Sequence, residues 1–183
     1  MKKILTSVIV TVLFCLCFAG STYAWLVATT TPVQNAFTAG NINIRLSETT
    51  SINKKMVPGA DLESNPKVTV DANSEDCWLF VKAAKSDLFD TFLEFEIADG
   101  WTLLDGTSDV YWRQVELSEN DQEFGVLRGN VVNVKSTPTK AQYDAITENN
   151  YPTVTFTAYA VQQLGFANAA AAWEEAKQLT ERT

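Results

Sequence analysis

The sequence predicts an export signal followed by one all-β domain, an antiparallel β-sandwich that ends in a short C-terminal helix. Three observations lead to this fold class. Short runs of alternating apolar and polar residues recur along the chain, turn signals such as Asp99-Gly100 separate them, and helical spacing is clearest after Gly165. A length of 183 residues with 46% hydrophobic content is typical of one folded domain. We therefore expect a signal peptide at residues 1–24 and the β-sandwich domain at residues 25–183.

The N-terminus has the three parts of a cleavable signal. Lys2-Lys3 is basic, residues 4–19 are almost entirely apolar, and small residues at positions 22 and 24 precede a break. This pattern predicts cleavage between Ala24 and Trp25, with an earlier site after Ala19 as an alternative. An uncleaved anchor is the competing interpretation, but the apolar run is shorter than the roughly 20 residues that span a bilayer.

Strands are expected wherever apolar residues alternate or cluster between turn signals. The expected strands cover residues 41–46, 67–70, 77–83, 92–97, 101–103, 110–117, 124–134 and 153–162. Within residues 124–134, Gly125 and Gly129 are expected to form bends or bulges. Residues 77–83 are almost continuously apolar, which favours a strand buried on both faces. Residues 153–162 alternate and should place Val154, Phe156, Ala158 and Ala160 on one face.

The remaining segments are expected to form loops and helices. Residues 54–66 read as a loop with a turn at Pro58-Gly59, and residues 139–146 as one short helical turn. Residues 167–179 are rich in Ala, Glu and Lys and predict a C-terminal helix capped by Asn168.

Composition excludes several function classes. The net charge is −8, and it becomes more negative when Lys2 and Lys3 leave with the signal, so nucleic acid and anionic membranes are poor partners. The chain has no histidine, which removes the commonest general base, the commonest zinc ligand and every Ser-His or Cys-His pair. Asp105-Gly106-Thr107 reverses the Asp-Thr-Gly order of aspartic proteases. We therefore predict no catalytic residue, no cofactor and no metal site, and membrane contact only through the signal before cleavage.

Three groups of residues have both a functional and a structural interpretation. Cys77, the cysteine outside the signal, links two subunits or is a small apolar residue of a core strand. The aromatic residues Trp101, Tyr111 and Trp112 form a platform for glycan rings or belong to the core. Six carboxylates bind calcium or form a solvated acidic face. These carboxylates belong to Asp105, Asp109, Glu116, Glu119, Asp121 and Glu123.

The most informative feature is the segment 25–44, which contains no charged residue and is rich in Thr, Val, Phe and Ile. An extended, charge-free segment at a new N-terminus can add to the sheet edge of a neighbouring copy, and head-to-tail addition of this kind produces filaments. The alternative is that it forms the first strands of its own sandwich. The predicted assembly strand consists of Trp25, Leu26, Val27, Ala28, Thr29, Thr30, Thr31, Pro32 and Val33.

Several motifs, in a fixed order, resemble a family of exported proteins. The matching segments are Thr22-Tyr23-Ala24-Trp25-Leu26, residues 35–42 (NAFTAGNI), Val57-Pro58-Gly59, residues 73–82 (NSEDCWLFVK), and Ala158-Tyr159-Ala160-Val161-Gln162 before Gly165-Phe166 and Ala172-Trp173. In these segments the chain is similar to the SipW-dependent exported proteins of the TasA/camelysin family of Gram-positive bacteria.

This resemblance implies a jelly-roll-like β-sandwich, cleavage by an alternative signal peptidase, and a secreted protein at the cell surface or in the biofilm matrix. It also implies self-association into matrix fibres. The protease activity attached to the camelysin members has no matching chemistry here, because the chain lacks histidine and any H-E-x-x-H motif. The expected function is that of a non-enzymatic structural protein of the matrix, with a surface-attached glycan- or protein-binding module as the alternative.

Overall fold

The computed structural model describes residues 41–48, 55–147 and 149–181. The predicted signal peptide, its cleavage site at Ala24 and Trp25, and the assembly strand Trp25–Val33 lie outside the described residues. The described residues belong to one compact unit, Ala39–Thr183.

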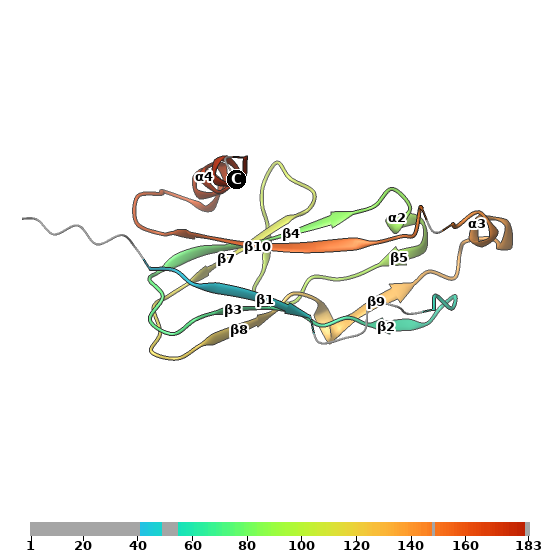
Figure 1. Ribbon diagram of the computed structural model, residues 1–183, viewed down its shortest axis with the longest axis horizontal. Helices are drawn as coiled ribbons and strands as arrows, with labels where there is room; N and C mark the ends of the chain where they lie inside the picture. The colour runs from blue at the N-terminus through green and yellow to red at the C-terminus, as the bar shows by residue number, and fades with distance from the viewer. Residues whose placement is uncertain (1–40, 49–54, 148, 182–183) are drawn as a thin grey trace, which may run out of the picture. The chain divides into compact units, whose positions relative to one another are not determined.

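The described part of the chain is mostly β, with three small antiparallel sheets and no closed barrel among them (Figure 1). Sheet A has the order β1 (Ile44–Glu48), β3 (Pro66–Val70), β8 (Gln122–Gly125). Sheet C has the order β10 (Val154–Gln162), β4 (Cys77–Lys85), β7 (Val110–Val115), β6 (Thr102–Leu103). Sheet B has the order β2 (Asp61–Glu63), β9 (Val131–Val134), β5 (Leu93–Glu94).

Strand β4 is buried on both faces, which confirms the prediction from its continuous apolar sequence. Cys77, Leu79 and Val81 pack in a cluster with Val68 and Val70 of sheet A. The alternate residues Trp78 and Phe80 point the other way and pack against the C-terminal helix. Strand β4 therefore lies between two apolar layers.

The C-terminal helix α4 (Ala169–Glu181) forms where its helical spacing predicted it. It begins as expected, because the side-chain oxygen of Asn168 accepts a hydrogen bond from the Ala171 N–H at 2.9 Å. Its buried face packs on sheet C, and Trp173 contacts Phe80 and Tyr159, each with a ring-centroid distance of 5.3 Å. No helix in the described ranges is long and apolar enough to cross a membrane.

The expected strand over residues 92–97 is wrong in most of its length. The short helix α2 (Phe89–Phe92) precedes a strand of two residues, β5. Phe89 and Phe92, three residues apart, are both buried, and a helical turn places side chains at that spacing on the same side. Burial of both rings in the core beneath sheet B thus outweighs the alternation that predicted a strand.

The single strand expected over residues 124–134 is divided into β8 and β9, which belong to different sheets. Gly129 and Asn130 have φ of 65° and 56°, values that a continuous strand does not allow, and they form a tight turn (Arg128–Asn130) before β9. Strand β2 lies inside the loop expected at residues 54–66 and pairs with β9. The turn at Pro58-Gly59 is confirmed, as is a helix α3 (Lys140–Asp144), which Thr139 caps.

Candidate functional site

One sheet edge differs from the others in length and in charge. The sheet orders leave β1, β8, β10, β6, β2 and β5 at edges. Of these, β10 has nine residues and no charged side chain, whereas none of the others exceeds five residues. Proteins usually protect sheet edges by shortening them or by placing charges on them. Strand β10 has neither protection, so its edge is the most receptive to another strand.

The backbone hydrogen bonds at both ends of β10 show which groups face outward. The Ser86 N–H donates to the Thr153 carbonyl at 2.9 Å, and the Gln163 N–H donates to the Asp76 carbonyl at 2.8 Å. Odd-numbered residues of β10 therefore direct their backbone groups toward β4, because the direction alternates along an antiparallel strand. The even-numbered residues direct theirs to the open edge. They are Val154, Phe156, Ala158, Ala160 and Gln162.

The same edge leaves part of the core incompletely covered. Phe156, Ala158 and Ala160 are half-buried and pack on the cluster that sheets A and C share. On the sheet A side, Ile42 and Ile44 are half-buried against that cluster too. Figure 1 shows β1 alongside β10, and they are edge strands of separate sheets with no ladder between them among the described residues. A strand added at β10 would therefore bury apolar surface as well as backbone groups.

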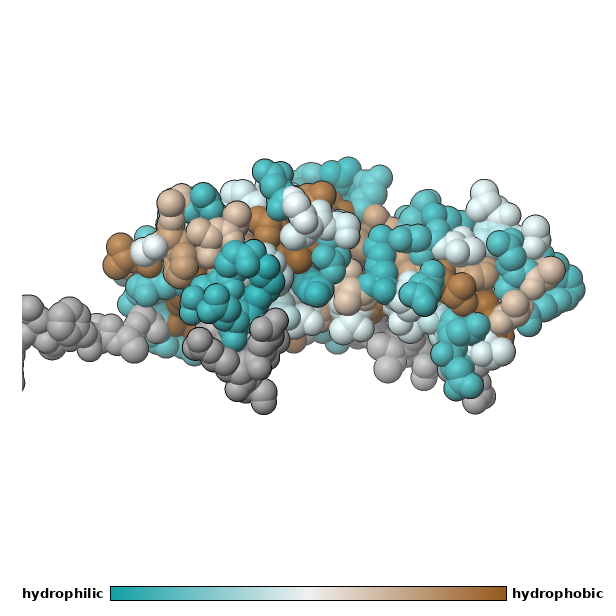
Figure 2. Space-filling view, turned by 90° about the horizontal axis from the view of Figure 1, so that it is seen from above, coloured by the Kyte–Doolittle hydropathy of each residue, from teal (hydrophilic) through white to brown (hydrophobic). Residues whose placement is uncertain are grey.

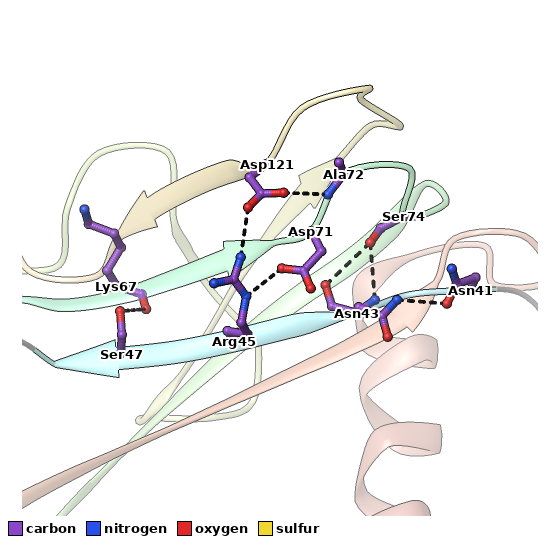
Figure 3. Close-up of polar contacts among 9 residues, drawn as sticks. All are labelled: Asn41, Asn43, Arg45, Ser47, Lys67, Asp71, Ala72, Ser74 and Asp121. Atoms are coloured by element: carbon purple, nitrogen blue, oxygen red, sulfur yellow. Dashed lines mark hydrogen bonds and ion pairs between the residues drawn. The ribbon is translucent and has the colours of Figure 1, made fainter.

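The first described strand, β1, is held to the domain by a polar network (Figure 3). The Arg45 guanidinium on β1 binds Asp71 at 2.7 Å and Asp121 at 2.8 Å, and Asp121 also accepts a hydrogen bond from the Ala72 N–H. The hydrogen bond from Arg45 to Asp71 is the main reason that the pKa of Arg45 is raised. The network joins β1 to the segments that follow β3 and precede β8.

A second contact fixes the residues just before β1. The buried hydroxyl of Ser74 accepts a hydrogen bond from the Asn43 N–H at 3.2 Å, and the Glu75 N–H donates to the Asn41 carbonyl at 3.1 Å. The chain therefore enters the domain beside Glu75, at the end of β4 that lies next to Gln162 of β10.

The structure places Cys77 in the core, as its structural interpretation predicted. The side chain has no exposed surface, and burial, followed by the nearby charge of Asp76, raises the pKa of the Cys77 thiol to about 11. A buried, protonated thiol is a poor nucleophile, so the folded domain does not present Cys77 for an intersubunit disulfide.

This pKa predicts a pH dependence of stability. The folded state keeps the Cys77 proton up to about pH 11 and the unfolded state loses it near pH 9, so the free energy of unfolding should fall as the pH rises between these values. The contribution should be fully present below pH 9. Urea unfolding from pH 7 to pH 11 would measure it, and Cys77→Ala should fall less steeply over this interval. Parallel curves for the two proteins would contradict the prediction.

The six predicted carboxylates do not come together. Asp121 and Glu123 are paired with Arg45 and Lys67, and Asp109 lies 3.9 Å from Lys82. Within the part of the chain that the structure describes, no group of three or more acidic or cysteine side chains could hold a metal ion. Their arrangement favours the solvated acidic face over the calcium site.

The aromatic platform is wrong, because Trp101 and Tyr111 pack on the cluster between sheets A and C, whereas Trp112 lies on the other face of sheet C. Trp101 is buried and its indole N–H donates to the Gly125 carbonyl at 2.9 Å, while Tyr111 packs on the cluster between sheets A and C. Trp112 packs on the opposite face of sheet C, edge-on to Trp78 at a centroid distance of 5.3 Å. These three rings therefore do not form a shared glycan-binding surface.

Comparison with protein-family models, with curated proteins and with solved structures gave no match. The functional conclusion therefore depends on the chain's own residues. Among the features that support this conclusion, the open edge of β10 is one that the sequence alone did not identify. Its signal was present in the nine uncharged residues, but whether a strand lies at an edge depends on the pairing of the whole chain.

Proposed function

We propose that this chain is an exported, non-enzymatic structural protein that assembles head to tail into fibres of the cell surface or biofilm matrix. Strand β10 of one copy would accept the mature N-terminal segment Trp25–Val33 of the next. The observation that carries the proposal is the nine-residue, charge-free edge of β10, with its outward backbone groups and half-buried apolar side chains. Because the donor and acceptor surfaces differ, the contact is heterologous, and it produces a filament when the rotation between copies does not close a ring.

The donor and acceptor have matching lengths and chemistry. Trp25–Val33 and β10 each have nine residues, about 30 Å when extended, and neither contains a charged side chain. A ladder between them would supply main-chain hydrogen bonds, and alternate side chains would set the register. The resemblance to SipW-dependent proteins supports the same role, since it implies export, removal of the signal by an alternative peptidase and fibre formation.

We interpret sheets A and C, whose side chains share one apolar cluster, as the two faces of a jelly-roll-like β-sandwich. On this interpretation, the open side lies at β1 and β10, where an added strand would complete the coverage of the core.

The test is to sequence the N-terminus of the exported protein and to examine the same sample by electron microscopy. We expect a start at Trp25 and filaments. Deletion of residues 25–33 should leave a folded monomer, with an unchanged far-ultraviolet circular dichroism spectrum, that forms no filaments. Filaments from the deletion variant would contradict the strand mechanism, and an intact N-terminus at Met1 would contradict the free strand itself.

A further inference from the structure

A concave site lies at the end of β10, where the strand turns toward α4. It has a volume of about 670 Å³ and its lining combines apolar and acidic side chains. Leu164 is 81% exposed and Leu117 is 61% exposed, so two leucines meet solvent at one site. Figure 2 shows hydrophobic surface at the end of the domain that carries this turn.

The acidic part of the site has a surplus of negative charge. Among the described residues, the Asp76 carboxylate accepts a hydrogen bond from the Leu117 N–H at 2.7 Å, and the Glu75 carboxylate accepts one from the Gln162 side-chain amide. No lysine or arginine of the described residues lies within 4.0 Å of either carboxylate. An apolar group that carries one positive charge would complement this surface.

The proposed function brings such a group to this site. The described sheets are all antiparallel, and an antiparallel donor that covers all of β10 has Val33 opposite Val154 and Trp25 opposite Gln162. After cleavage, Trp25 carries the new α-amino group, the one positive charge of the segment 25–44, next to a large apolar ring.

The position of Pro32 agrees with this register. When Trp25 is opposite Gln162, Pro32 lies opposite Thr155, whose backbone groups point toward β4 and not toward the donor strand. The missing N–H of proline therefore costs no hydrogen bond to β10. A shift by one residue would place Pro32 where its N–H is needed. Side chains opposite one another share a face, so Trp25 would lie on the same side as Gln162, which contacts Glu75.

We infer that this pocket binds the first residue of the mature N-terminus of a neighbouring copy. The α-amino group of Trp25 pairs with Glu75 and Asp76, and its indole ring packs on Leu117, Leu164 and Phe166. The inference rests on the proposed function. It makes signal cleavage a condition for strong assembly, because cleavage creates the charged α-amino group that the pocket binds.

The test measures the critical concentration for filament formation of mature chains. One chain starts at Trp25, a second carries Gly-Ser ahead of Trp25, and a third carries Leu164→Ser. Both changes should raise the critical concentration about tenfold, the size expected for the loss of one apolar contact or one desolvated charge pair. The matched control is Leu103→Ser, which alters a leucine of 46% exposure on β6 at the opposite edge of sheet C and should change nothing.

The outcomes separate this inference from the proposed function. Absence of filaments from the chain that starts at Trp25 would overturn the proposed function. Filaments at the same critical concentration for all variants would leave that function standing and overturn the pocket. A lower critical concentration for Leu164→Ser would overturn it too, since the pocket would then hold the N-terminus of its own chain.

Discussion

Replacement of Ala158 by proline should abolish filament formation while the domain stays folded. Ala158 directs its backbone groups away from β4, so proline removes an N–H that the β4 ladder does not use. The ring would occupy the position that an incoming strand needs. We expect a loss of stability of only about 1 kcal/mol, and a complete loss of filaments by electron microscopy and light scattering.

Two matched variants make this result specific. Ala158→Val has a similar volume and keeps the N–H, so it should assemble like the wild type. Thr157→Pro removes a bond to β4 instead and should cost about 3 kcal/mol or more of stability. Ala160→Pro tests the same edge if Ala158→Pro does not fold. Normal filaments from either edge proline would show that β10 is not the acceptor.

Phe80→Ala should cause the largest loss of stability, about 3–5 kcal/mol. The Phe80 ring is fully buried between sheet C and α4 and contacts Trp173 at a centroid distance of 5.3 Å, so its removal leaves a cavity beneath the helix. A loss of this size is a large part of the total stability of a typical domain, about 5–15 kcal/mol.

Urea denaturation, followed by tryptophan fluorescence, would measure the free energy of unfolding of Phe80→Ala and of the wild type. Thr155→Ala is the matched control, because Thr155 is an exposed residue on the neighbouring strand and should change stability by less than about 0.5 kcal/mol. A loss below about 1 kcal/mol for Phe80→Ala would mean that α4 does not depend on this face of sheet C.

The local sequence pattern predicted the structure correctly where one or both faces of a helix or strand had to be buried. The continuous apolar run of β4 predicted burial on both sides, and the alternation of β10 predicted that Phe156, Ala158 and Ala160 share one face. It did not predict that Tyr159 and Val161, on the other face, also pack on a core cluster. The cap at Asn168 and the turn at Pro58-Gly59 depend on neighbouring residues alone, so the sequence predicted them as well.

Pattern failed where distant packing decided the conformation. Alternation over residues 92–97 suggested a strand, but the burial of Phe89 and Phe92 on one side favours a helical turn. Residues 124–134 read as one strand bent at Gly125 and Gly129, yet the turn at Gly129 divides them between two sheets. Such outcomes depend on which surfaces lie nearby, and no window of sequence contains that information.

The sequence by itself determined that the segment Trp25–Val33 has the chemistry of an added strand, because the absence of charge and the β-branched residues are local properties. For Cys77 and the aromatic residues the sequence left a functional and a core interpretation open, and the structure places them against the core. Only the tertiary structure decided that β10 lies at an edge and that Glu75, Asp76 and Leu164 meet at its end. Strand order and pocket lining arise from contacts between residues up to about ninety positions apart, and these contacts form only when the whole domain folds.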